Sequence, residues 1–179
     1  MKLRVLTVGL VAAVLLPAAA FADAATASDK ANGARACQAL RTSLGEATFN
    51  SSYGTNADKS NAFGKCVSKW TRLEHQNRNE AEAACKAERA DASFAAAHGD
   101  KTFDQFYGTG KQGANALLRC VQSKRHAASV VDRQATVNAA RSCKAERKEL
   151  GTTAFVAKYG TKANAFGKCV STLTQAHKG

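Results

Sequence analysis

The chain has 179 residues, a formal net charge of +12 and a single proline. Its large aromatic residues are only eight Phe, three Tyr and one Trp, so its core must be thin and rich in alanine. Beyond the N-terminal residues, no segment is long and apolar enough to cross a membrane, which takes about 20 apolar residues. A transmembrane protein is therefore excluded for the mature chain.

The first residues have the layout of a secretory signal peptide. Two basic residues precede an apolar run over 5–16, and alanines follow it, as signal peptidase requires. We predict a signal peptide over 1–22, with cleavage after Ala22 or Ala24, and then a flexible N-terminus over 23–34. The run is too short to span a membrane, and a retained anchor is disfavoured because the small residues that follow the run are well formed for cleavage. The mature chain is expected to be secreted, either extracellular or associated with the cell envelope.

All six cysteines follow this segment, and an even number outside the cytosol indicates three disulfides. Zinc binding is disfavoured because structural zinc sites use close pairs such as C-x-x-C, and the nearest pair here is Cys66 and Cys85. A catalytic thiol would lack a nearby reactive partner. We expect no metal and no cofactor. The predicted disulfide residues are Cys37, Cys66, Cys85, Cys120, Cys143 and Cys169.

One sequence pattern occurs three times along the chain. Each copy opens with Cys-x-Ala-x-Arg, continues to an aromatic pair and Tyr-Gly-Thr, and closes with Asn-Ala-x-x-Lys/Arg-Cys-Val. The interval from the asparagine to the closing cysteine is the same in all three copies. We therefore predict a single helical domain over 35–179 that consists of three repeats, over 35–73, 81–124 and 139–173.

Each repeat is predicted to be a helical hairpin. Phe63, Cys66, Val67 and Trp70 follow the i, i+3, i+4, i+7 spacing of an amphipathic helix. The repeats differ in length around Tyr-Gly-Thr, and insertions are tolerated at loop tips, so this region is expected to be the tip. A short helix with a glycine at its C-terminal end is expected there.

Two long helices are expected to connect the hairpins. The segments 60–97 and 112–150 contain no proline and almost no glycine, which favours continuous helix with room for a break near 77–79. No strand pattern is present. The predicted fold is all-α, an elongated helical bundle or array of three disulfide-stapled hairpins with two long shared helices.

Repeat symmetry selects one pairing of the cysteines. The two cysteines of a repeat are roughly equidistant from its tip, so antiparallel arms bring them level, as a disulfide requires. We predict the bonds Cys37–Cys66, Cys85–Cys120 and Cys143–Cys169. Each would stabilise the fold by about 3 to 4 kcal/mol in the chain-entropy model. Because the core is thin, these bonds should supply a large part of the stability.

Three polar or aromatic positions recur, and we interpret them as structural. Each arginine is placed to bond tip carbonyls and cover the disulfide, with binding of an anionic ligand as the alternative. Each asparagine is expected to cap or brace a closing helix, and each tyrosine to lie in the core. The positions are Arg41, Arg89 and Arg147; Asn61, Asn115 and Asn164; and Tyr53, Tyr107 and Tyr159.

The sequence contains no cluster that indicates catalysis. The four histidines have no ligand spacing and no equivalent repeat positions. Glu88 and Glu146 recur, but Leu40 takes that position in the first repeat, which disfavours a paired-carboxylate hydrolase. We predict a non-enzymatic protein. The alternatives are a secreted enzyme or enzyme inhibitor that acts through a tip loop, and a structural or stress-resistant envelope component.

The positive charge is concentrated in the C-terminal half. Residues 23–110 include 11 basic and 11 acidic residues, whereas 111–179 include 13 basic and 3 acidic residues, an excess of +10. Such a surface attracts an anionic envelope polymer, lipid headgroups or an acidic protein; the alternative is a solvated face. Nucleic acid is a weaker candidate because the aromatic residues are needed inside. The candidate anion-binding residues are Arg119, Lys124, Arg125, Arg133, Arg141, Lys144, Arg147 and Lys148.

The motifs Cys-Lys-Ala-Glu-Arg, Tyr-Gly-Thr and Asn-Ala-Phe-Gly-Lys-Cys-Val-Ser resemble the cysteine repeats of uncharacterised exported bacterial proteins, found in high-GC species. The resemblance covers nearly the whole mature chain. It implies a secreted bacterial protein, and it carries over no activity, cofactor or catalytic residue.

Overall fold

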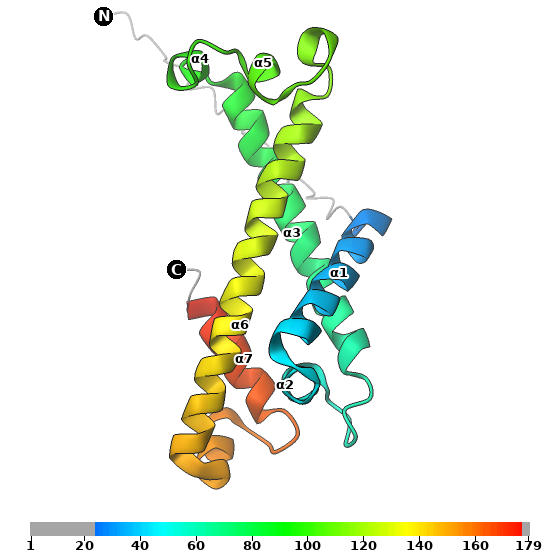
Figure 1. The fold of residues 1–179 in the computed structure, drawn as a ribbon, viewed down its shortest axis with the longest axis vertical. Helices are drawn as coiled ribbons and strands as arrows, with labels where there is room; N and C mark the ends of the chain where they lie inside the picture. Colours follow the sequence, from blue (N-terminus) through cyan, green and yellow to red (C-terminus); the bar gives the residue numbers. More distant parts are fainter. Residues whose placement is uncertain (1–23, 177–179) are drawn as a thin grey trace, which may run out of the picture.

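Two long helices form the frame of the molecule. The computed structural model describes residues 24–176, and every regular element within them is a helix. Helices α3 (Ala62–Ala90) and α6 (Ala116–Tyr159) run in opposite directions along the long axis (Figure 1). The all-α prediction is therefore confirmed. The predicted signal peptide over 1–22 lies outside the described residues.

Each repeat contributes one hairpin to this frame. The first repeat uses the start of α3 as its closing arm, the second joins the end of α3 to the start of α6, and the third uses the end of α6. The second repeat forms one end of the molecule, and the first and third lie side by side at the other (Figure 1). The remaining elements are α1 (Ala27–Leu44), α2 (Glu46–Tyr53), α4 (Phe94–Ala97), α5 (Phe103–Tyr107), the 3₁₀ turn η1 (Lys111–Gly113) and α7 (Ala165–Ala176).

A disulfide joins the two arms of every hairpin. The bonds are Cys37–Cys66, Cys85–Cys120 and Cys143–Cys169, as predicted, with Cα–Cα distances of 5.9, 6.0 and 6.0 Å. Each bond is fully buried in its own apolar cluster, so the core consists of three small clusters. The described residues contain no free cysteine. Disulfides of this kind persist in an oxidising, non-cytosolic environment.

One of the two long helices, α3, differs in extent from the prediction, whereas the long part of α6 ends where it was expected. Helix α3 passes through 77–79 without a break and ends at Ala90 instead of residue 97. It ends there because the Asp91 carboxylate accepts hydrogen bonds from both the backbone N–H and the hydroxyl of Ser93, which turn the chain. Helix α6 is interrupted at Gly151, whose φ of +74° is not helical, so its long part ends at residue 150 as predicted and a short helical segment follows to Tyr159. Gly45 makes the same interruption between α1 and α2.

The N-terminal segment is more ordered than predicted. A flexible chain was expected over 23–34, whereas α1 begins at Ala27. Thr26 and Asp29 form a capping box, in which each side chain accepts a hydrogen bond from the other's backbone N–H, at 3.2 and 2.8 Å. The Asp29 carboxylate is fully buried and lies 3.0 Å from an Arg125 nitrogen. This contact with a distant helix is why the first turn is fixed.

Arg125 is the centre of a buried ion cluster where α1, α3 and α6 meet. Its Nε lies 3.1 Å from Glu74, whose other oxygen accepts a hydrogen bond from the Ser129 hydroxyl at 2.6 Å. Arg78 approaches Asp29 from α3 at 3.5 Å. Burial alone would raise the pKa of the Asp29 carboxyl, but hydrogen bonds from Thr26 and the charges of Arg125 and Arg78 hold the pKa below its usual value.

We predict that Asp29→Asn destabilises the protein at neutral pH and that the deficit shrinks in acid. The folded-state pKa of Asp29 lies below its unfolded value of about 3.9. The carboxylate therefore stabilises the fold above that pH, and this contribution is lost as the pH falls through the folded-state pKa. Urea unfolding at about pH 7 and about pH 2 measures the deficit. The exposed Asp100→Asn serves as control, and a deficit independent of pH would contradict the ionic role.

Candidate functional site

The first and third repeats pack directly against each other through α2 and α7 (Figure 1). Gly167 of α7 lies so close to α2 that a Cβ atom there would be 2.6 Å from the Ser52 carbonyl oxygen. The ammonium group of Lys59 donates hydrogen bonds to the carbonyl oxygens of Gly54, at 2.9 Å, and Ala163. These contacts join two tips that are more than a hundred residues apart in the sequence.

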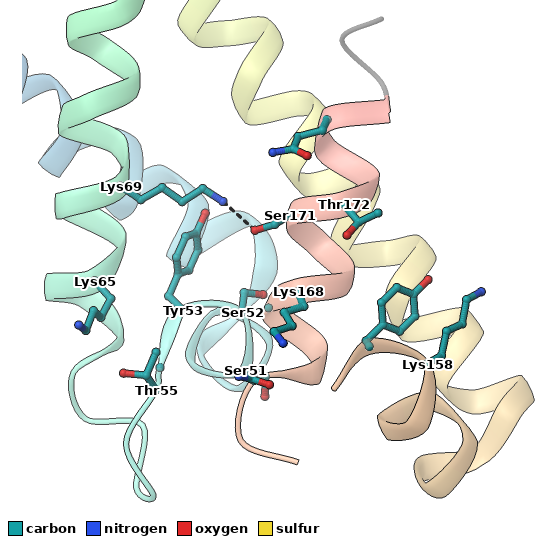
Figure 2. A pocket seen from close by; sticks show the side chains of 15 residues that line it. Ser51, Ser52, Tyr53, Thr55, Lys65, Lys69, Lys158, Lys168, Ser171 and Thr172 are labelled. Carbon is teal, nitrogen blue, oxygen red and sulfur yellow. Dashed lines mark hydrogen bonds between the residues drawn. The ribbon is translucent and has the colours of Figure 1, made fainter. Parts of the chain in front are cut away.

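A groove of about 490 Å³ lies along this junction and is open to solvent rather than enclosed (Figure 2). We call it the lysine groove. It is bounded by the tip of the first repeat, the start of α3, the end of α6, and α7. Its lining residues are Ser51, Ser52, Tyr53, Gly54, Thr55, Lys65, Lys69, Lys158, Tyr159, Asn164, Gly167, Lys168, Ser171, Thr172 and Gln175.

Four lysines line the groove, and none of its described lining residues is acidic. Lys65 and Lys168 have no acidic partner within residues 24–176. Lys158 donates a hydrogen bond to Glu146 at 2.6 Å, and this bond lowers the pKa of the glutamate and raises that of the lysine. Lys69 reaches across to the Ser171 hydroxyl at 3.1 Å (Figure 2). The groove is therefore positively charged.

Hydroxyl groups and two tyrosine rings complete the groove. Ser51, Thr55 and Thr172 place hydroxyls among the lysines (Figure 2). Tyr53 is buried and accepts a hydrogen bond from the Trp70 indole at 3.2 Å; burial raises its pKa to about 12, so the ring stays neutral. The lining supplies cations and neutral hydrogen-bond groups, which suits an anion that also carries oxygen acceptors.

The eight basic residues predicted to bind anions do not gather at one site, although Arg125 and Arg133 line one cavity and Lys144 and Arg147 another. Lys124 pairs with Glu88 at 2.7 Å, and Arg125 is held in the buried ion cluster with only 11% of its side chain exposed. The Arg147 guanidinium lies over the ring of Phe166, at 5.2 Å. None of the eight lines the lysine groove. The other five of the eight residues are exposed or half-exposed; they are Arg119, Arg133, Arg141, Lys144 and Lys148.

Arg133 lines a second cavity, of about 580 Å³, between α1, α3 and α6. Arg78 and Arg125 also line it, and carboxylates of Glu82, Glu74 and Asp29 hold their guanidinium groups. The positive charge of this cavity is therefore largely compensated. The lysine groove is the more strongly cationic of the two.

Sequence reasoning missed the four lysines of the groove. The excess of positive charge over 111–179 predicted anion binding in that segment, whereas Lys65 and Lys69 of the groove belong to the first repeat. A usable signal was nevertheless present. Lys65 and Lys168 occupy the same position in two identical Asn-Ala-Phe-Gly-Lys-Cys motifs.

Two of the three recurring asparagines brace the tips, as predicted, whereas the third, Asn164, accepts a hydrogen bond from the Thr161 hydroxyl at 2.9 Å. Asn61 accepts a hydrogen bond from the backbone N–H of Thr55 at 3.0 Å and donates one to its hydroxyl at 2.9 Å. Asn115 makes the same pair of bonds with Thr109, at 2.9 and 2.8 Å. Their side chains do not cap the following helices. They hold the Gly-Thr segment against the start of the closing arm.

The recurring arginines have partners other than the tip carbonyls expected. Arg41 pairs with Glu46 at 2.6 Å, and Arg89 approaches Asp104 at 3.5 Å. Both carboxylates lie in the first turn of a short helix, where negative charge is favourable, and an arginine can reach them from the preceding arm. Each arginine therefore contacts its own repeat, and no shared arginine site forms.

The recurring glutamates act as partners of the tyrosines. Tyr107 donates a hydrogen bond to Glu88 at 3.0 Å, and Tyr159 donates one to Glu146 at 2.9 Å. The first repeat has Leu40 at the glutamate position, and its tyrosine instead meets Trp70. Each of these glutamates thus bonds the tyrosine of its own hairpin.

Comparison with protein-family models, curated proteins and solved structures finds no match. Within residues 24–176, no group of three or more His, Cys, Asp or Glu side chains is placed to hold a metal ion. No helix in that part of the chain is long and apolar enough to span a membrane.

Gly64 and Gly167 occupy equivalent positions in the first and third repeats. Replacing them with alanine is predicted to have opposite effects on stability. A Cβ at Gly64 meets nothing within 4 Å, so alanine should stabilise the helix by about 0.5–1 kcal/mol. At Gly167 the added carbon would collide with Ser52 and should cost about 1–3 kcal/mol. Chemical denaturation measures both effects. Changes of the same sign would contradict the close packing of α7 on α2.

Proposed function

We propose that this chain is an exported, non-enzymatic bacterial protein that binds an anionic polymer of the cell envelope through the lysine groove. The observation that carries the proposal is the convergence of four lysines in one groove with no acidic lining residue. The signal-peptide pattern and the three disulfides support an exported protein.

The chemistry of the groove favours an anion with several oxygen atoms. Lysine ammonium groups act as compact point charges with three donors each, and they bind phosphate without needing the planar geometry that arginine requires. The neighbouring hydroxyls of Ser51 and Thr172 can bond further oxygens of the same ligand. Since the groove is open to solvent rather than enclosed, it can take part of a longer polymer whose remainder lies outside it.

The remaining basic surface supports the same proposal at longer range. Lys158 and Lys168 belong to the basic C-terminal half, and Arg141, Lys144 and Lys148 are exposed on α6. Positive charges at the surface attract a polyanion over about one Debye length, roughly 8 Å at physiological salt. They would therefore speed its approach, while the groove supplies the short-range contacts.

Chromatography of the mature protein on phosphocellulose tests the proposal. The triple variant Lys65→Ala/Lys69→Ala/Lys168→Ala should elute at clearly lower salt than the wild type. Three exposed ionic contacts of about 0.5–1 kcal/mol each correspond to binding that is roughly ten- to a hundredfold weaker.

The matched control is Arg119→Ala/Lys144→Ala/Lys148→Ala, which removes the same charge from exposed positions outside the groove. It should shift elution much less. Equal shifts for the two triple variants would mean that only net charge matters. Retention that is unchanged in the groove variant would contradict the site altogether.

A further inference from the structure

The lysine groove contains two copies of the same set of side chains. Lys65 and Lys168 each precede the closing cysteine of an Asn-Ala-Phe-Gly-Lys-Cys motif, and Tyr53 and Tyr159 each end a short helix before Gly-Thr. All four line the groove. One copy comes from the first repeat and the other from the third.

The two copies are held in a fixed relation. The contact of Gly167 with Ser52 and the bonds of Lys59 to both tips join the repeats on either side of the groove. Figure 2 shows Lys65 on α3 and Lys168 on α7, with residues of α2 between them.

Resting on the proposed function, we infer that the groove takes a linear chain of phosphate groups and binds at least two of them at once, one at Lys65 and one at Lys168. A repeating ligand matches a repeated set of donors, because the second contact forms within the complex at a high effective concentration. We take phosphate as the repeating anion because lysine ammonium groups are common phosphate ligands, and the lining hydroxyls can bond its further oxygens.

The second repeat provides an internal control. Arg119 stands at the position of Lys65 and Lys168, directly before the closing cysteine. The second repeat lies at the opposite end of the molecule (Figure 1), and Arg119 does not line the groove. Arg119→Ala therefore removes a charge at the equivalent position without touching the groove.

Isothermal titration calorimetry with orthophosphate and with long linear polyphosphate, at one ionic strength, tests the inference. The mature wild-type protein should bind two orthophosphate ions weakly, or one polyphosphate chain across the groove at least a hundredfold more tightly. Lys65→Ala and Lys168→Ala should each leave one orthophosphate site and weaken polyphosphate binding at least tenfold. Arg119→Ala should change neither result.

The inference is overturned by a single orthophosphate site in the wild type, or by polyphosphate binding that depends on only one of the two lysines. An equal loss with Arg119→Ala would also overturn it, because net charge would then explain the affinity. Binding to phosphatidylglycerol vesicles distinguishes lipid headgroups from a linear phosphate chain as the ligand. If vesicle binding depends equally on Lys65 and Lys168, lipid headgroups are indicated instead. The proposed function fails separately, if the groove and control triple variants behave alike on phosphocellulose.

Discussion

The rest of the structure depends on one covalent constraint that occurs three times, the disulfide that joins the two arms of each hairpin. Each apolar cluster holds one such bond, a few aromatic rings and two or three alanines. The apolar surface that such a cluster buries is small, so its burial offsets only part of the conformational entropy lost when the chain folds. Closing loops of 26 to 35 residues stabilises each hairpin by about 3 to 4 kcal/mol in the chain-entropy model. Many outward-facing positions are thereby free to carry charge.

A buried ion cluster then decides how the hairpins stand relative to one another. Asp29 from α1 and Glu74 from α3 share Arg125 from α6. Buried charges are costly when they lose their partners, so sliding any of these helices by one turn would be strongly unfavourable. This register places the first repeat beside α6, and the contact of Gly167 with Ser52 completes its junction with the third repeat. The lysine groove is a consequence of that junction.

Repetition in the sequence identifies equivalent positions, but it does not say which of them face one another. Lys65, Arg119 and Lys168 are equivalent in the sequence, yet only the two lysines line the groove. The tyrosines show the same dependence on context. Two bond a glutamate of their own repeat, whereas Tyr53 meets Trp70 because its repeat has leucine at the glutamate position. Equivalent residues therefore acquire different roles from their neighbours.

The sequence alone determined the helical class, the three hairpins and the disulfide pairing, because these follow from spacing and symmetry within each repeat. It also indicated the brace formed by Asn61 and Asn115. The ordered start of α1 and the lysine groove were decided only by tertiary structure. Asp29 is fixed by Arg125, 96 positions away, and the groove needs two tips that a backbone contact at Gly167 brings together. Counting charge along the chain cannot find such a site, since it does not register which basic residues already have acidic partners.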